Sequence, residues 1–226
     1  MLITRVLELN EEESTELFFA AFPHFPLWIT AIHNNLNLYQ TYEIMEKNGY
    51  STTEIIENDP SFAFKINDID ALREKLLFER FRKENRPVKV NYLFGDSGTG
   101  KTRSIYEKHP PEDVYRITDY SGQSGARFDD YHGEPAIVFE EFHSQVPISA
   151  MLNFLDIYPL RLPARYRDRV ACFNTVYITS NIPLEQQYQK IQRKELETWN
   201  AFLRRIHTVT EFRRGMPPRE VPHETV

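Results

Sequence analysis

The sequence has few glycines, one cysteine and no long apolar run. Cys172 is the single cysteine among 226 residues, which excludes an internal disulfide and any metal site built from several cysteines. No apolar run approaches the roughly 20 residues of a membrane-spanning helix, so we expect no membrane partner. Hydrophobic residues still make up 41% of the chain, which is enough for a buried core. These features are typical of a globular protein of a reducing compartment.

Acidic charge is concentrated toward the amino-terminal end. Residues 1–60 hold ten acidic and two basic side chains, which leaves 23 acidic and 25 basic side chains in residues 61–226. The second part is nearly neutral but contains local arginine clusters, and such clusters can bind an anionic polymer. The net charge of −6 therefore neither supports nor excludes a nucleic-acid partner.

The pattern of predicted elements changes near Pro87, and no internal repeat precedes or follows it. Three stretches before it are typical of helices: 38–49 ends at a glycine, 51–60 opens with a capping-box pattern, and 67–86 has apolar residues at helical spacing. The β-rich runs after Pro87 are "VKVNYLF", "DVYRIT", "EPAIVFE" and "FNTVYITS", and helical or loop stretches separate them. Alternating strands and helices predict an α/β fold with a mostly parallel sheet.

These patterns divide the chain into four predicted parts. The tail contains three prolines among polar residues, and we expect it not to pack. The parts are an N-terminal segment of uncertain role over 1–40, a helical domain over 41–86, an α/β domain over 87–211 and a flexible tail over 212–226.

Three of the eight glycines lie within six positions, in the segment Gly95-Asp96-Ser97-Gly98-Thr99-Gly100-Lys101-Thr102. The segment matches the pattern G-x-x-x-x-G-K-[ST] of a phosphate-binding loop, and it lies between a predicted strand and a predicted helix, as that loop requires. Glycines let successive backbone N–H groups approach phosphate oxygens. We therefore expect ATP and Mg²⁺ as cofactors, with Lys101 on the β- and γ-phosphates and the Thr102 hydroxyl on the metal.

Two further predicted strands end in polar side chains that suit the same chemistry. The run "PAIVFEEF" places Glu140 and Glu141 directly after four apolar residues. The first carboxylate would support Mg²⁺, and the second would polarise the attacking water. The strand "NTVYITSN" ends in Asn181, whose amide could bind the γ-phosphate or that water.

The run "AFLRRIHTV" places Arg204 and Arg205 next to each other in an apolar frame. One interpretation is an arginine finger that enters the nucleotide site of a neighbouring subunit, where it would stabilise charge on the transferred phosphoryl group. The other interpretation is a surface or intramolecular salt bridge. A finger that acts on a neighbour requires the protein to assemble into a ring.

The segment "YPLRLPARYRDRV", residues 158–170, interleaves basic and aromatic side chains. Guanidinium groups bind phosphates and aromatic faces stack on bases, which is the combination that contact with a single strand requires. A solvated hairpin is the alternative interpretation. The predicted nucleic-acid contacts are Arg161, Arg165, Tyr166 and Arg167.

In this order, the motifs resemble the helicase part of the Rep replication proteins of circovirus-type viruses and rolling-circle plasmids, which belongs to superfamily 3. The resemblance covers roughly residues 88–211 and extends weakly to the helices of 41–86, which in such proteins form a small oligomerisation domain. It implies an AAA+ fold, ATP hydrolysis between subunits of a hexameric ring and 3′-to-5′ movement on single-stranded DNA. It also implies location in the cytoplasm of a bacterial host, or in the nucleus if the protein is viral in a eukaryotic host.

The resemblance also assigns residues. It implies the Walker B pair at Glu140 and Glu141, a sensor at Asn181, and the finger at Arg204 or Arg205, of which we favour Arg205. Residues 161–167 fall in the region of the hairpins that grip the strand, although "ARYRDR" replaces the usual lysine-glycine turn, and Glu140 stands where aspartate is usual. No His-x-His pair occurs, so we expect no nicking endonuclease chemistry in this chain.

Three alternatives to a DNA helicase remain at this stage. Motors of the same superfamily act on RNA. A P-loop small-molecule kinase would share the glycine loop, but it needs an acceptor-binding lid that is not evident in the sequence. A non-enzymatic ring assembled around ATP is disfavoured by the carboxylate of Glu141.

Overall fold

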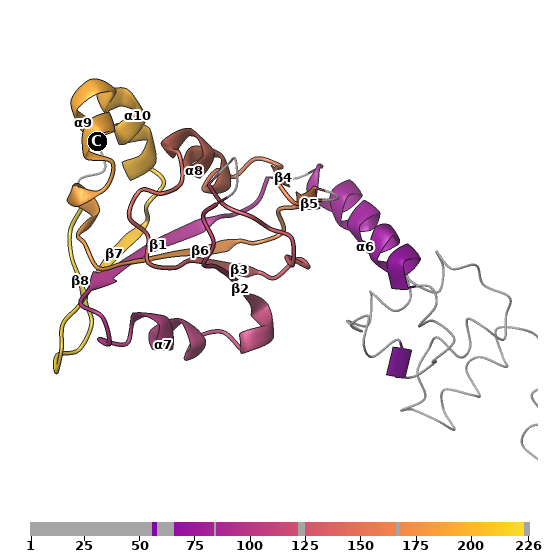
Figure 1. Cartoon of the computed structure of the whole chain (residues 1–226), viewed down its shortest axis with the longest axis horizontal. Coiled ribbons are helices and arrows are strands. Elements are labelled where there is room, and N and C mark those ends of the chain that lie inside the picture. Colours follow the sequence, from indigo (N-terminus) through magenta and orange to yellow (C-terminus); the bar gives the residue numbers. More distant parts are fainter. Residues whose placement is uncertain (1–55, 58–65, 84, 122–124, 166–167, 224–226) are drawn as a thin grey trace, which may run out of the picture. The chain divides into compact units, whose positions relative to one another are not determined.

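The computed structural model describes residues 56–57, 66–83, 85–121, 125–165 and 168–223 (Figure 1). The chain divides into two compact units, Met1–Leu76 and Leu77–Val226. In the first unit, residues 56–57 and the start of α6 (Ile66–Phe81) are helical. The helix predicted over 38–49, most of the one predicted over 51–60 and the segment 1–40 lie outside the described residues.

The boundary between the units falls within α6, rather than at the predicted change near Pro87. Its last turns carry Leu77, Phe78 and Phe81, which pack against the core of the second unit. The chain that follows is tied to the same unit, because the Arg86 guanidinium donates to the backbone carbonyls of Phe173 and Asp156 at 3.1 and 2.8 Å. The last turns of α6 and the chain that follows therefore belong to the second unit because of the contacts that they make there, although the helix itself continues across the boundary.

A six-stranded, mostly parallel sheet forms the centre of the second unit. Its order is β2-β3-β6-β1-β7-β8; all neighbouring pairs are parallel except β7 and β8. This arrangement confirms the predicted α/β class, and each of the four predicted β-rich runs contains a strand. The strands are β1 (Lys89–Gly95), β2 (Val114–Ile117), β3 (Ala136–Phe139), β6 (Thr175–Ser180), β7 (Thr208–Phe212) and β8 (Arg219–Glu220).

Both faces of the sheet are covered, which is why its central strands are apolar on both sides. Side chains alternate between the faces, so Ile137 and Phe139 of β3 join one core cluster, whereas Ala136 and Val138 join the other. The helix α7 (Lys101–Tyr106) covers the face of the second cluster. The opposite face is covered by α8 (Ile148–Phe154), α9 (Gln189–Lys194) and α10 (Leu196–Leu203).

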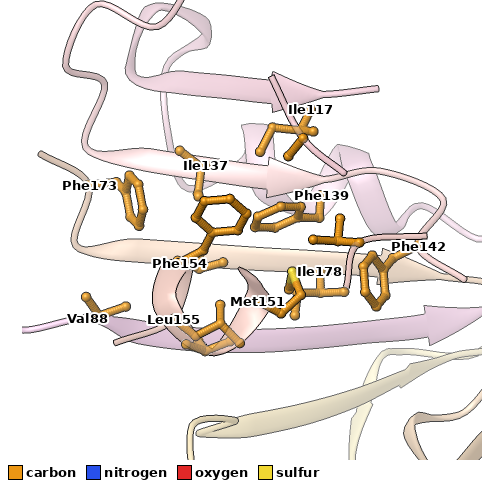
Figure 2. Packing of buried hydrophobic residues seen from close by; sticks show 14 of the residues in the cluster. Val88, Ile117, Ile137, Phe139, Phe142, Met151, Phe154, Leu155, Phe173 and Ile178 are labelled. Atoms are coloured by element: carbon orange, nitrogen blue, oxygen red, sulfur yellow. The ribbon is translucent and has the colours of Figure 1, made fainter. Parts of the chain in front are cut away.

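The larger cluster is rich in aromatic side chains. Figure 2 shows Phe154, Met151 and Leu155 of the α8 region packed over Phe139 and Ile178 of the sheet. Phe139 and Phe154 stack with their ring centroids 6.0 Å apart. Burying each large apolar side chain stabilises the fold by about 1.5–3 kcal/mol. This packing holds the strand ends, and the polar residues that follow them, in a rigid frame.

The prediction that the tail does not pack is wrong for residues 219–223. The strand β8 pairs with β7, and the backbone N–H of Val221 donates to the carbonyl of Val209 at 2.9 Å. The strand β7, which none of the predicted runs covers, offers its open edge to these residues. Backbone hydrogen bonding does not need an apolar sequence, so a polar, proline-rich tail can still complete a sheet.

A second, two-stranded antiparallel sheet lies in the basic segment. It consists of β4 (Arg161–Leu162) and β5 (Arg169–Val170).

No helix among the described residues is long and apolar enough to cross a membrane.

Candidate functional site

The predicted site residues converge because β3, β6 and β1 are neighbours that run parallel. The carboxyl ends of parallel strands meet at the same edge of a sheet, and ligand sites form there at a switch point. At this edge β1 leads into α7 on one face, whereas β6 leads toward α9 and α10 on the other (Figure 1). Adjacent strands whose connections leave to opposite faces define such a switch point between β1 and β6.

The loop that follows β1 depends on its glycines. Gly95, Gly98 and Gly100 have φ angles of 143°, 78° and 97°, which favour a residue without Cβ. A Cβ on Gly95 would also lie 2.0 Å from the backbone oxygen of Phe212 in the neighbouring strand β7. The loop can therefore pass close to the sheet edge only with glycine at this position.

Lys101 is the first residue of α7, and its ammonium group lies at the loop. The side chain is nearly buried, with 6% of the residue exposed. The Nζ atom donates to the carbonyl oxygens of Gly95 and Asp96 at 2.6 and 3.0 Å, and to Oδ1 of Asn181 at 3.2 Å. Burial lowers the pKa of Lys101, while the nearby carboxylates of Glu141, Asp96 and Glu140 act to raise it.

Glu140 is the most enclosed carboxylate of the site, with 7% of the residue exposed. Its Oε2 accepts hydrogen bonds from the hydroxyls of Thr102 and Thr179 at 3.3 and 3.1 Å. Its Oε1 accepts one from Nε of Arg116 at 3.1 Å, which forms an ion pair. A nearly buried carboxylate is stabilised by this charge and these donors.

Glu141 and Asn181 face each other across the ends of β3 and β6. The Asn181 amide nitrogen donates to Oε2 of Glu141 at 2.9 Å, while its oxygen accepts from Lys101. Glu141 has a φ of 47°, and its backbone N–H donates to the hydroxyl of Thr179 at 3.3 Å. Asn181 therefore links the lysine of the loop to the second carboxylate, which is exposed to solvent.

Mg²⁺ is the metal that the sequence predicts, and the donor set fits it only in part. The described residues contain no group of three or more histidine, cysteine or acidic side chains that could hold a metal ion. The Thr102 hydroxyl and the Glu140 carboxylate do lie together, and Mg²⁺ is usually held by one or two protein oxygens together with substrate phosphates. The residues thus fit a metal that arrives with a nucleotide rather than one held by protein alone.

Sequence reasoning missed Arg116, Thr179 and Tyr120, all of which contact Glu140. The Tyr120 hydroxyl donates to the backbone carbonyl of Glu140 at 2.6 Å. Arg116 and Tyr120 belong to no motif, and Thr179 lies in a quoted run but was not assigned a role. Arg116 reaches Glu140 because its strand β2 pairs with β3, with Arg116 opposite Val138. Only its position in "NTVYITSN" could have indicated Thr179, as a polar side chain within the buried part of the strand, two residues before Asn181.

The two adjacent arginines differ in their surroundings. Arg205, the favoured finger, donates through Nη2 to Oδ2 of Asp156 at 2.5 Å and through Nη1 to the carbonyl of Ala201 at 2.8 Å. The pKa of Asp156 lies below its usual value. Burial acts to raise this pKa, but the hydrogen bond and charge of Arg205 contribute to lowering it. Arg204 is exposed. Of the two, Arg204 is therefore the one whose side chain is available to a neighbour.

Of the predicted nucleic-acid contacts, the structure describes Arg161 and Arg165 of the β4–β5 hairpin, whose Leu162 and Val170 belong to the larger core cluster. Arg161 stacks its guanidinium over the ring of Phe78, 4.3 Å from the centroid. Arg165 is exposed and its Nε lies 3.8 Å from a carboxylate oxygen of Asp129. Tyr166 and Arg167 lie outside the described residues. Neither Arg161 nor Arg165 contacts the cluster around Lys101.

Comparison of the sequence with protein-family models finds no matching family, and comparison with curated proteins finds no match.

Proposed function

We propose that this protein is an ATP-driven motor of the superfamily 3 helicase type, with an AAA+-like P-loop domain that moves on single-stranded DNA. The observation that carries the proposal is the convergence of five side chains at the ends of three neighbouring strands. The sequence predicts each of them for nucleotide chemistry, and each contacts at least one other member of the set. The five are Lys101, Thr102, Glu140, Glu141 and Asn181.

The contacts suggest a role for each residue. The glycine loop and Lys101 bind the phosphates, with phosphate oxygens taking the place of the carbonyl oxygens that Lys101 now contacts. Thr102 and Glu140 hold Mg²⁺, which neutralises developing charge on the phosphates when bound. Glu141 accepts a proton from the attacking water at its carboxylate, and the Asn181 amide orients that carboxylate.

Single-stranded DNA is the proposed track, and the β4–β5 hairpin is its proposed contact. Arg161 and Arg165 are exposed there, and the sequence between the two strands also contains Tyr166 and Arg167. Such side chains bind phosphates and stack on bases without reading the sequence. The proposed active form is a homo-oligomeric ring, hexameric in the family that the sequence resembles.

We expect ATP hydrolysis that single-stranded DNA stimulates several-fold. The measurement is steady-state phosphate release with and without an unstructured oligonucleotide, repeated with an RNA strand of the same sequence. Stronger stimulation by RNA would redirect the proposal to an RNA motor. Hydrolysis that neither strand stimulates, by a protein that stays monomeric with ATP, would contradict a nucleic-acid motor and favour a small-molecule kinase.

We expect Glu141→Gln to lower the turnover number of ATP hydrolysis by about 100-fold while ATP still binds, because the amide cannot accept the proton of the attacking water. The exposed side chain makes the change structurally mild. Glu107→Gln, an exposed glutamate at the end of α7, is the matched control. Turnover by Glu141→Gln at the level of the control would remove Glu141 from the mechanism.

A further inference from the structure

Gln187 is a fully buried glutamine that follows the short 3-10 helix η3 (Leu184–Gln186). Its Oε1 accepts a hydrogen bond from the hydroxyl of Ser144 at 2.7 Å. Its Nε2 lies 2.8, 2.9 and 3.1 Å from the Tyr92 hydroxyl, the Phe142 carbonyl and the Ser180 hydroxyl. A carbonyl can only accept, so the amide nitrogen must face Phe142, and this sets the orientation of the whole amide.

The Ser180 and Tyr92 hydroxyls each donate their single hydrogen to a backbone carbonyl. Ser180 donates to the carbonyl of Phe142 at 2.7 Å, and Tyr92 donates to the carbonyl of Ile182 at 2.9 Å. Both can therefore accept from the amide nitrogen of Gln187. A buried polar network in which every hydrogen has an acceptor is rigid, and an incomplete one is costly. The buried amide of Gln187 therefore has hydrogen-bond partners for both its oxygen and its nitrogen.

The network surrounds the residues proposed to act on water. Ser180 and Ile182 lie on either side of Asn181, and both are held, since the N–H of Ile182 also donates to the Ser180 hydroxyl at 3.2 Å. Phe142 follows Glu141 directly, and its N–H donates to the carbonyl of Thr179 at 2.8 Å. Its ring packs edge-on to Phe139 in the core (Figure 2). One amide therefore connects the backbone after β3 to the backbone after β6.

Backbone strain is concentrated at the same place. Among the described residues other than glycine, those with positive φ are Glu141, Ser144 and Tyr188, at 47°, 62° and 48°. Ser144 donates to Gln187, and the N–H of Tyr188 donates back to the Ser144 hydroxyl at 2.8 Å. Such conformations persist only where surrounding contacts enforce them, and they cluster at functional sites.

We infer that Gln187 is a positioning residue for ATP hydrolysis: its amide holds the loops after β3 and β6 so that Glu141 and Asn181 stay in contact. The inference rests on the proposed function. Gln187 touches neither side chain itself. It acts through Phe142, Ser180 and Tyr92, which fix the backbone directly after Glu141 and on both sides of Asn181.

The test compares Gln187→Leu with Gln186→Leu, the same change at the exposed neighbouring glutamine. We expect Gln187→Leu to lower the turnover number for ATP about tenfold or more, since small displacements of catalytic groups are costly, while KM changes by less than about twofold. We expect KM to change little because the loop proposed to bind the phosphates is not part of the network. In Gln186→Leu we expect both the turnover number and KM to stay at their wild-type values.

Ser144 supplies a second pair of variants, in case Gln187→Leu does not fold. Ser144→Ala and Ser144→Gly both remove the hydroxyl, but glycine relieves the left-handed backbone, so the glycine variant should melt at the higher temperature. Turnover numbers that fall equally in both, despite different melting temperatures, would support positioning. If instead the variant with the higher melting temperature also has the higher turnover number, the positioning role is overturned.

Hydrogen exchange separates this inference from the proposed function. In Gln187→Leu we expect faster amide exchange over 140–146 and 179–188, with the exchange of β1 unchanged. A wild-type protein that hydrolyses no ATP would refute the proposed function, and the exchange pattern would still test the role of Gln187. Unchanged exchange and unchanged turnover in Gln187→Leu would overturn the inference.

Discussion

Lys101→Ala is expected to abolish ATP hydrolysis, with a loss of at least about 1,000-fold, because the variant loses the cation proposed to bind the β- and γ-phosphates. The residue is nearly buried, and its ammonium group lies between two carbonyl oxygens of the loop and the Asn181 amide. Steady-state phosphate release measures the loss, and binding of a fluorescent ATP analogue shows whether affinity falls with it.

Lys108→Ala is the matched control for this prediction. Lys108 is exposed just beyond the end of α7, so its removal leaves the loop and both carboxylates in place. Thermal unfolding of each variant shows whether either change perturbs the fold. If Lys101→Ala folds and hydrolyses ATP as fast as Lys108→Ala, the glycine loop is not a nucleotide site, and the proposed motor function fails with it.

Arg204→Ala is expected to lower ATP hydrolysis by about 1,000-fold without destabilising the protein, since an arginine finger contributes that much to phosphoryl transfer. Arg204 is exposed and would act on the nucleotide of a neighbouring copy. Arg205→Ala should behave in the opposite way. It removes the contacts with Asp156 and Ala201 and should cost about 1–2 kcal/mol of unfolding free energy, with hydrolysis largely kept.

Mixing variants tests whether the finger acts between subunits. Arg204→Ala subunits retain the loop lysine, and Lys101→Ala subunits retain the finger. Mixed oligomers therefore contain interfaces in which both groups are intact, and hydrolysis should partly return. Two inactive variants that remain inactive when mixed, although they form mixed oligomers, would place the finger elsewhere or show that no subunit completes the site of another.

The strands and the glycine loop could be predicted because their signals are local. Runs such as "PAIVF" are apolar at every position, which is typical of a strand covered on both faces, and the structure places β3 inside the sheet, between β2 and β6. The loop pattern specifies the conformation of its own backbone, and Gly95, Gly98 and Gly100 all adopt positive φ angles. The polar residues after such strands were assigned to the same chemistry as the loop, and Lys101 does contact Asn181 while Thr102 contacts Glu140.

The partners of these residues could not be predicted, because they depend on which strands are neighbours. Arg116 contacts Glu140 only because β2 pairs with β3 in one particular register. Gln187 is one of several glutamines in its segment, and nothing in the sequence separates it from exposed Gln186. Its burial follows from the path of the chain between β6 and α9.

By itself, the sequence determined the class of the fold, the glycine loop and the identity of the polar residues after each strand, since short-range backbone preferences and apolar patterns decide these. The tertiary structure alone decided that Arg205 is held by Asp156 while Arg204 is exposed, and that a polar tail adds β8 to the sheet. Those outcomes arise from contacts between residues far apart in the chain. Such contacts depend on strand order and on the packing of helices against the sheet, which no local pattern records.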